Sequence, residues 1–309
     1  MAEKMHELLK EVTERVDQVI LGKQEQVQLA LCSLFARGHL LIEDIPGIGK
    51  TTLAKVLAEI LGLDFRRVQC TSDMLPGDIL GVSVFEQKSG QFIFHPGPIF
   101  TQVLLSDEIN RTTPKTQSAL LEAMEEQQIT IEGKSYPLPS PFFVIATLNP
   151  LEQAGTFPLP ESQLDRFLFR IKIGYPDRAA ELKLLRGGGT QKKQEEIKPL
   201  LTPEKVTQCQ EMAAAIHISD TLVHYVQSLL EFSRTAPDFY TGLSPRAGLS
   251  LIRASQSWAL INGRAFVLPE DVQKVLPYVA THRLRRVDSL TEMTGEELLE
   301  LFASVPVPP

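Results

Sequence analysis

The chain reads Leu40-Leu41-Ile42-Glu43-Asp44-Ile45-Pro46-Gly47-Ile48-Gly49-Lys50-Thr51-Thr52 near its beginning, and this stretch decides the fold. Its first four residues predict a short strand, and the good helix formers of residues 51–61 predict a helix directly after the loop. Small residues in the loop allow successive backbone N–H groups to turn inward around a bound phosphate. A strand, a glycine-rich loop and a helix in this order indicate a phosphate-binding loop of the Walker A type.

Lys50 and Thr51 supply the side chains that such a loop needs. Lys50 is expected to neutralise oxygens of the β- and γ-phosphates, and the Thr51 hydroxyl to bind Mg²⁺, while the helix N-terminus adds partial positive charge. Asp44 stands where the motif has its first glycine, which leaves the local turn geometry open. The loop predicts binding of ATP or ADP with Mg²⁺ by Pro46, Gly47, Ile48, Gly49, Lys50, Thr51 and Thr52.

A second apolar segment ends in two acids, Val103-Leu104-Leu105-Ser106-Asp107-Glu108. These carboxylates are expected at the C-terminal edge of a parallel sheet, where ligands of such sheets bind. Asp107 is then a Mg²⁺ ligand acting through the water shell, and Glu108 orients and polarises the attacking water. An acidic pair alone is more commonly a solvated loop. Together with the upstream loop, the pair indicates ATP hydrolysis.

Five short apolar runs predict strands, at residues 40–43, 66–70, 102–106, 142–147 and 167–173. Helical patterns separate several of them, which indicates a parallel sheet covered on both faces. Residues 79–94 and 128–138 each have the pattern of a hairpin and are interpreted as insertions. After residue 174 the pattern is helical, with no convincing strand. We therefore expect an α/β nucleotide-binding domain over residues 1–174 and a helical domain over residues 175–309.

Composition narrows the possible partners. The 309 residues are 43% hydrophobic and 22% charged, and the net charge of −7 gives no overall positive field for nucleic acid or an anionic membrane. Three cysteines far apart fit a reducing cytoplasm better than a disulfide framework. The charged N-terminus lacks a secretory apolar run, and no apolar stretch approaches the ~18 residues that span a bilayer. A soluble cytoplasmic protein without membrane insertion is expected.

Three further polar residues lie beside predicted elements. Asn149 ends the strand at residues 142–147 with an amide suited to the γ-phosphate or the attacking water. Arg166 comes just before the last predicted strand, and Arg246 lies at a predicted helix start. Alone, Asn149 fits a turn before Pro150 equally well, and each arginine fits a surface ion pair.

The motifs together resemble the MoxR family of AAA+ ATPases, from about residue 15 to about residue 285. Besides the loop, the resemblance rests on Ser106-Asp107-Glu108-Ile109-Asn110-Arg111, Ala146-Thr147-Leu148-Asn149-Pro150, Pro158-Leu159-Pro160-Glu161-Ser162-Gln163-Leu164-Asp165-Arg166-Phe167 and Leu243-Ser244-Pro245-Arg246-Ala247. It implies a P-loop AAA+ fold with a five-stranded parallel sheet, two hairpin inserts and an all-helical C-terminal lid domain.

The resemblance also implies roles for single residues. Asn149 would be sensor 1, Arg166 the arginine finger that acts on a neighbouring subunit's ATP, and Arg246 the sensor 2 residue of the lid. The run Val19-Ile20-Leu21-Gly22 matches the segment that packs against adenine in such proteins. The finger implies a homo-oligomer, by resemblance a hexameric ring.

Several biological roles fit these motifs. The leading hypothesis is a chaperone-like remodeller or maturation factor for a partner protein, since the family is associated with von Willebrand factor A domain proteins. Alternatives are a nucleic-acid motor, which the acidic balance disfavours, and the ATPase subunit of a metal chelatase. A nucleotide-binding module without turnover is a further alternative, but such a module needs neither Glu108 nor Arg166.

Overall fold

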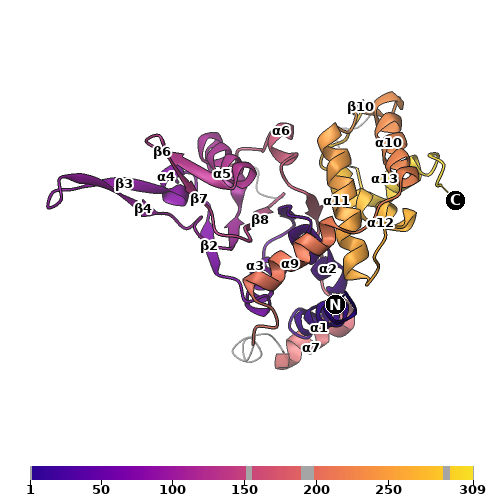
Figure 1. Ribbon diagram of the computed structural model, residues 1–309, viewed down its shortest axis with the longest axis horizontal. Helices are drawn as coiled ribbons and strands as arrows, with labels where there is room; N and C mark the ends of the chain where they lie inside the picture. Colours follow the sequence, from indigo (N-terminus) through magenta and orange to yellow (C-terminus); the bar gives the residue numbers. More distant parts are fainter. Residues whose placement is uncertain (1, 151–154, 189–197, 288–292, 309) are drawn as a thin grey trace.

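The computed structural model describes residues 2–150, 155–188, 198–287 and 293–308 (Figure 1). Its centre is a five-stranded sheet in the order β2-β5-β8-β1-β9, and every neighbouring pair is parallel. The strands are β1 (Leu40–Glu43), β2 (Phe65–Gln69), β5 (Val103–Asp107), β8 (Phe143–Leu148) and β9 (Phe169–Ile171). The predicted parallel sheet is confirmed, with β9 shorter at both ends than the predicted strand at residues 167–173.

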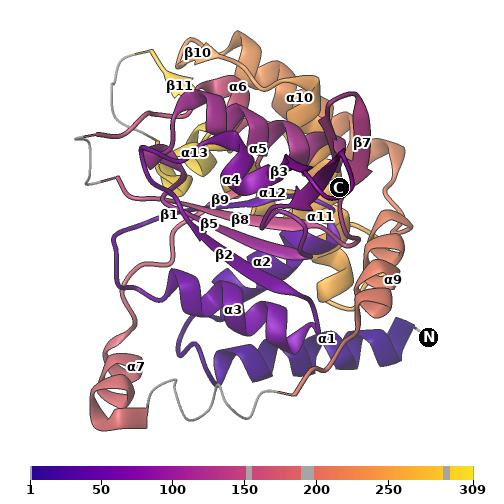
Figure 2. The same cartoon turned by 90° about the vertical axis from the view of Figure 1, so that its left-hand side faces the viewer.

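Alternation along the strands builds two apolar cores. Leu40 and Ile42 of β1 point to one face of the sheet, and Leu41 points to the other. The first face is covered by α1 (Ala2–Asp17), α2 (Gln24–Phe35) and α3 (Lys50–Ile60), and the second by α5 (Pro114–Glu126) (Figure 2). The layers explain why the buried strands are apolar at nearly every position.

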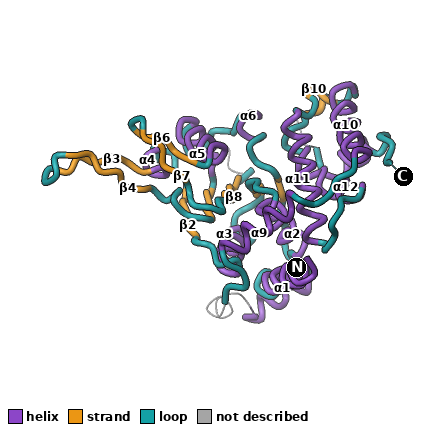
Figure 3. Tube along the Cα trace, in the orientation of Figure 1, coloured by secondary structure: helices purple, strands orange, loops and turns teal. Residues whose placement is uncertain are grey.

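Both predicted hairpin inserts are present on the α5 side of the sheet. The first consists of α4 (Pro76–Leu80), β3 (Gly81–Glu86) and β4 (Gln91–Pro96), and its antiparallel strands extend far from the body (Figure 3). The second pairs β6 (Gln128–Ile131) with β7 (Lys134–Pro137). Ile79 and Ile129 anchor the two inserts in the apolar core that α5 covers.

The C-terminal part is built mainly of helices, most of which begin after a serine or threonine cap. The helices are α9 (Pro203–Ala214), α10 (Asp220–Thr235), α11 (Pro245–Ile261), α12 (Pro269–Ala280) and α13 (Gly295–Phe302). Ser244 caps α11 by accepting a hydrogen bond from the Ala247 N–H, and Pro245 follows at the first helical position, where no N–H is needed. The shorter elements lie earlier in the chain. They are η1 (Ile109–Arg111) between β5 and α5, α6 (Glu161–Leu164) between β8 and β9, and α7 (Arg178–Lys183) and η2 (Leu184–Gly188) after β9.

One detail of the helical part needs correction. We expected no convincing strand after residue 174, but β10 (Phe239–Thr241) pairs antiparallel with β11 (Arg285–Arg286). Strands of three and two residues are too short to show an alternating pattern in the sequence. The α/β fold with a helical lid is otherwise confirmed, and the domain limit at residue 174 stays a prediction. Within the described residues, no helix has the length and apolar character needed to cross a membrane.

Candidate active site

The glycine-rich loop connects β1 to α3 at the C-terminal edge of the sheet. Gly47 (φ 86°) and Gly49 (φ 94°) adopt left-handed backbone conformations that other residues rarely adopt. A Cβ atom added at either position would meet nothing within 4 Å, so backbone geometry rather than space requires glycine. The loop lines a cavity of about 360 Å³ together with Pro46, Lys50, Thr51, Thr52, Arg67, Gln69, Asp107 and Glu108.

Asp44 shows why the first glycine of the motif is dispensable here. Its φ is not positive, and its carboxylate accepts hydrogen bonds from the N–H of Ile45 at 2.9 Å and of Gly174 at 2.6 Å. The side chain therefore closes the turn and joins the start of the loop to the segment after β9. The turn at the start of the loop therefore forms without a glycine at residue 44.

Lys50, which lines the cavity together with the second cation Arg67, is buried, with 7% of its surface exposed. Its ammonium donates to the carbonyl of Asp44 at 2.5 Å and lies 3.5 Å from that of Leu148. Burial lowers the pKa of Lys50, although the carboxylates of Asp107, Asp44, Glu108 and Glu43 favour its charged form. A bound phosphate would favour the charged form of Lys50 further.

The two acids after β5 are tied together by one hydroxyl. Thr147 of β8 donates to Oδ1 of Asp107 at 2.6 Å and accepts the N–H of Glu108 at 2.8 Å. Glu108 has φ 58°, a left-handed conformation uncommon outside glycine. The hydroxyl therefore fixes the Asp107 carboxylate and the strained backbone of Glu108 at once.

The remaining contacts of the acids are cationic or amide groups. Arg67 of β2 donates to Oδ2 of Asp107 through two nitrogens, at 2.7 and 3.1 Å. Oε2 of Glu108 lies 3.1 Å from Nε of Arg111 and accepts from Gln69 Nε2 at 3.2 Å. Both carboxylates are thus held in place at the wall of the cavity.

The structure brings most of the predicted loop and acid residues together. Asn149 is buried directly after β8, and Ile48 packs against the apolar core. Residues 19–22, predicted to contact adenine, do not line the cavity. The residue that follows them, Lys23, donates at 2.7 Å to the carbonyls of Ile173 and Tyr175, on either side of Gly174, whose N–H is bound by Asp44.

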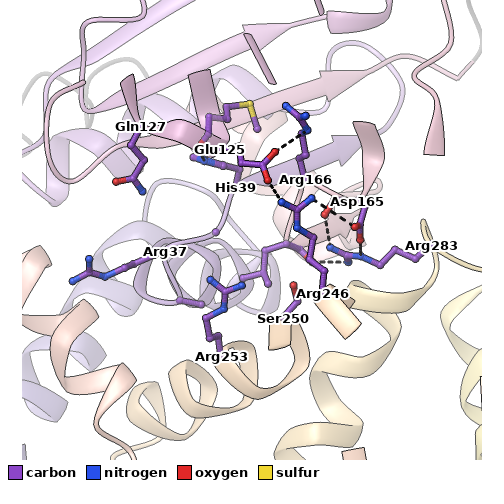
Figure 4. Close-up of a pocket in the computed structure, with 14 residues that line it drawn as sticks. Arg37, His39, Glu125, Gln127, Asp165, Arg166, Arg246, Ser250, Arg253 and Arg283 are labelled. Carbon is purple, nitrogen blue, oxygen red and sulfur yellow. Dashed lines mark hydrogen bonds and ion pairs between the residues drawn. The ribbon is translucent and has the colours of Figure 1, made fainter. Parts of the chain in front are cut away.

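Arg166 and Arg246 lie in a second cavity of about 310 Å³ (Figure 4). Its charged lining consists of five arginines and two acids, Arg37, Arg166, Arg246, Arg253, Arg283, Glu125 and Asp165. Arg246, from the start of α11, reaches across to Glu125 and Asp165 of the α/β part. Burial, with a smaller contribution from Arg246, lowers the pKa of Arg253. The arginine cavity is therefore a place where an anion would be stabilised.

The two cavities share no lining residue and lie at opposite ends of β1. Residues 46–52 follow β1, whereas His39, which lines the arginine cavity, precedes it. Four residues at ~3.3 Å each separate the ends of the strand by about 13 Å. The lid places Arg246 beside Arg166 and not in the loop cavity of its own chain, and the expectation that Arg246 binds nucleotide stays a prediction.

Sequence reasoning missed four residues that the geometry makes important: Arg67, Gln69, Thr147 and Glu125. Thr147 had a visible signal, because it is a polar residue in an otherwise apolar buried strand. Arg67 and Gln69 alternate on an edge strand and have the pattern of a solvated face. Glu125 lies on the polar side of a helix, where only the tertiary structure shows that two arginines meet it.

This fold and this site define a P-loop ATPase of the AAA class, and comparisons with known proteins agree. The model of the ATPase family associated with various cellular activities (AAA) matches residues 39–169, and the AAA lid domain matches residues 231–301. A crystal structure of a Cytophaga hutchinsonii protein provisionally described as an ATPase is similar, with TM-score 0.91 and 33% identity. The match covers 100% of this chain and 97% of that one.

Curated relatives narrow the class further. The chain is 38% identical to Chaperone MoxR1 of Mycobacterium tuberculosis, over 97% of this chain and 81% of that protein. It is 31% identical to Protein MoxR of Paracoccus denitrificans, over 98% and 97% of the two chains. YeaC of Bacillus subtilis is 42% identical over 91% of this chain and 88% of its own length. The chain belongs to the MoxR family of AAA+ ATPases.

Proposed function

We propose that the protein hydrolyses ATP with Mg²⁺ at the interfaces between identical subunits and uses this reaction to remodel a partner protein. The observation that carries the proposal is the separation of the two cavities. One cavity holds Lys50, Thr51, Asp107 and Glu108, and the other presents Arg166 and Arg246 at the far end of β1. In a ring, the arginine cavity of one subunit can face the loop cavity of the next. Such a ring brings the residues of the two cavities together.

The residues of the loop cavity suit a magnesium nucleotide. Mg²⁺ in such sites takes few protein ligands and many from phosphates and water, and the cavity offers the Thr51 hydroxyl and the Asp107 carboxylate for this purpose. When bound, the ion neutralises charge that develops on the phosphates. Lys50 binds the β- and γ-phosphate oxygens, and the N-terminus of α3 supports them.

Glu108 is the proposed general base. Its carboxylate is held by Arg111 and Gln69, and its backbone by Thr147, so its position at the cavity wall is fixed before nucleotide binds. Asn149, buried at the end of the neighbouring strand, is the proposed sensor for the γ-phosphate. Arg166 and Arg246 of the adjacent subunit would stabilise the charge of the transition state.

A protein partner is supported by the name of the mycobacterial relative and by the first insert. The β3–β4 hairpin exposes Val82, Val84, Phe85, Phe92 and Ile93, each with 39–62% of its surface accessible. Exposed apolar side chains that extend from the body suit contact with another protein. We propose a hexameric ring in the cytoplasm, acting on a von Willebrand factor A domain protein or a similar folded partner.

The test is steady-state phosphate release with Mg²⁺ and with a chelator, for the wild type and Glu108→Gln. Wild-type turnover should require Mg²⁺. Glu108→Gln should bind ATP with unchanged affinity but release no phosphate above background, because the amide keeps the shape and removes the base. Normal phosphate release by this variant would show that Glu108 is not the base.

A further inference from the structure

Glu125 lies in the last turn of α5, where its carboxylate meets two arginines from different parts of the chain (Figure 4). Its Oε2 is 3.3 Å from Nε of Arg166, which precedes β9. Its Oε1 accepts a hydrogen bond from Nη2 of Arg246, in the first turn of α11. One carboxylate therefore joins an arginine of the α/β part to an arginine of the lid.

The two guanidinium groups are held in different ways. The closest contact of Glu125 with Arg166 is to the inner nitrogen, Nε, and within the described residues no hydrogen bond from the terminal nitrogens, Nη1 and Nη2, to an acid is found. Arg246 instead directs both terminal nitrogens to acids, Nη2 to Glu125 and Nη1 to Asp165 at 3.9 Å. An arginine fixed at Nε keeps the end of its planar fork available, and this end binds phosphate oxygens in pairs. The contact thus orients Arg166 without occupying its binding end.

The balance of charge makes Glu125 necessary for this arrangement. Five arginines line the cavity, and its second acid, Asp165, is already bound by Arg283 at 2.6 Å. Arg283 is also buried and donates to the carbonyl of Phe167 at 2.7 Å, so it has a structural role. Without Glu125, Arg166 and Arg246 would lose their shared counter-charge and repel each other.

We propose that Glu125 is a positioning residue for hydrolysis between subunits. It holds Arg166 and Arg246 side by side and presents the terminal nitrogens of Arg166 to the terminal phosphate of ATP bound in the neighbouring subunit. This inference rests on the proposed function, in which Arg166 acts on the neighbour's nucleotide. Glu125 would act only through the two arginines, without contacting the nucleotide or the attacking water itself.

The experiment compares Glu125→Gln with Glu126→Gln in the full chain. Both residues are exposed and both variants lose one negative charge at the end of α5, but Glu126 lines a different cavity, beside β6. Glu125→Gln should lower kcat for Mg-ATP hydrolysis by roughly 10- to 100-fold, the range that a small misplacement of a reacting group produces. Its affinity for ATP should stay within about twofold of wild type, because the loop cavity is intact. Glu126→Gln should match wild type in both values.

A second comparison separates positioning from general damage. In an Arg166→Ala background, Glu125→Gln should lower the single-turnover rate by less than about twofold. The effects of the two substitutions are not additive if the two residues act as one unit. Glu125→Asp, which keeps the charge on a shorter side chain, should retain more activity than Glu125→Gln.

Three outcomes would overturn the inference. The first is that Glu125→Gln has the same kcat as Glu126→Gln. The second is that Glu125→Gln lowers the rate by the same factor in wild type and in the Arg166→Ala background. The third is a kcat of Glu125→Asp that is no higher than the kcat of Glu125→Gln. If the glutamine variant does not fold, the aspartate variant is compared with wild type instead. If Arg166→Ala itself keeps the wild-type kcat, the proposed function fails, and this result is distinct from the other three.

Discussion

Replacing Thr147 by valine tests whether one hydroxyl holds Asp107 and Glu108, the two acids that we propose take part in hydrolysis. The side chain of Thr147 is fully buried, and valine has nearly the same shape, so the change removes two hydrogen bonds and little packing. Leaving a buried donor or acceptor without a partner costs about 1–3 kcal/mol. Because the hydrogen bond from the Glu108 N–H is only partly buried, we expect a combined loss of roughly 2–4 kcal/mol in the free energy of unfolding.

The matched control is Thr147→Ser, which keeps the hydroxyl and loses one methyl group at a cost of about 1 kcal/mol. Urea denaturation followed by circular dichroism measures both variants, and the midpoint should shift with an unchanged slope. Thr147→Val should also lower kcat while ATP affinity is retained. Equal stability of the valine and serine variants would show that other contacts, such as Arg111 and Gln69, hold Glu108, and our account of the hydroxyl would be wrong.

Other predictions concern the loop, the finger and a buried histidine. Lys50→Ala should abolish tight ATP binding in calorimetry, and Arg166→Ala should bind ATP normally but lose roughly 10³-fold or more in rate. His39 is buried, accepts the Val144 N–H at Nδ1 and faces the Met124 carbonyl through Nε2, and burial lowers its pKa to about 4. Because the unfolded chain binds a proton near pH 6.5 and the folded one does not, stability should fall by about 3 kcal/mol between pH 6.5 and 4. Urea midpoints at pH 7.5, 5.5 and 4.5 measure this loss, and unchanged midpoints would contradict it.

Much of the α/β part could be predicted from local sequence. The loop at residues 44–52 and the acids at residues 107–108 each follow an apolar strand, and the partners of parallel strands are limited by the need for helical crossovers. The hairpin at β3–β4 was visible because it alternates around a turn. The pairing of β10 with β11 could not be predicted, because strands of three and two residues are too short to show an alternating pattern.

The position of the lid could not be predicted from sequence. Ser244-Pro245 marks the start of α11, but the direction in which Arg246 points depends on how α11 packs against α2 and α9. The same is true of Glu125, which has the appearance of one more solvated acid in a helix rich in glutamate. Side chains whose partners lie more than 40 residues away in the chain become interpretable only when the elements are placed.

The most direct test of the account mixes two inactive variants, Lys50→Ala and Arg166→Ala. The first has an intact finger and no working loop, and the second has an intact loop and no finger. A mixed ring contains interfaces at which an intact loop meets an intact finger, so ATP hydrolysis should partly return on mixing, to a level set by the fraction of such interfaces. A mixture that stays inactive while sizing shows mixed oligomers, or a dilute monomer that hydrolyses ATP at the full rate, would contradict catalysis between subunits.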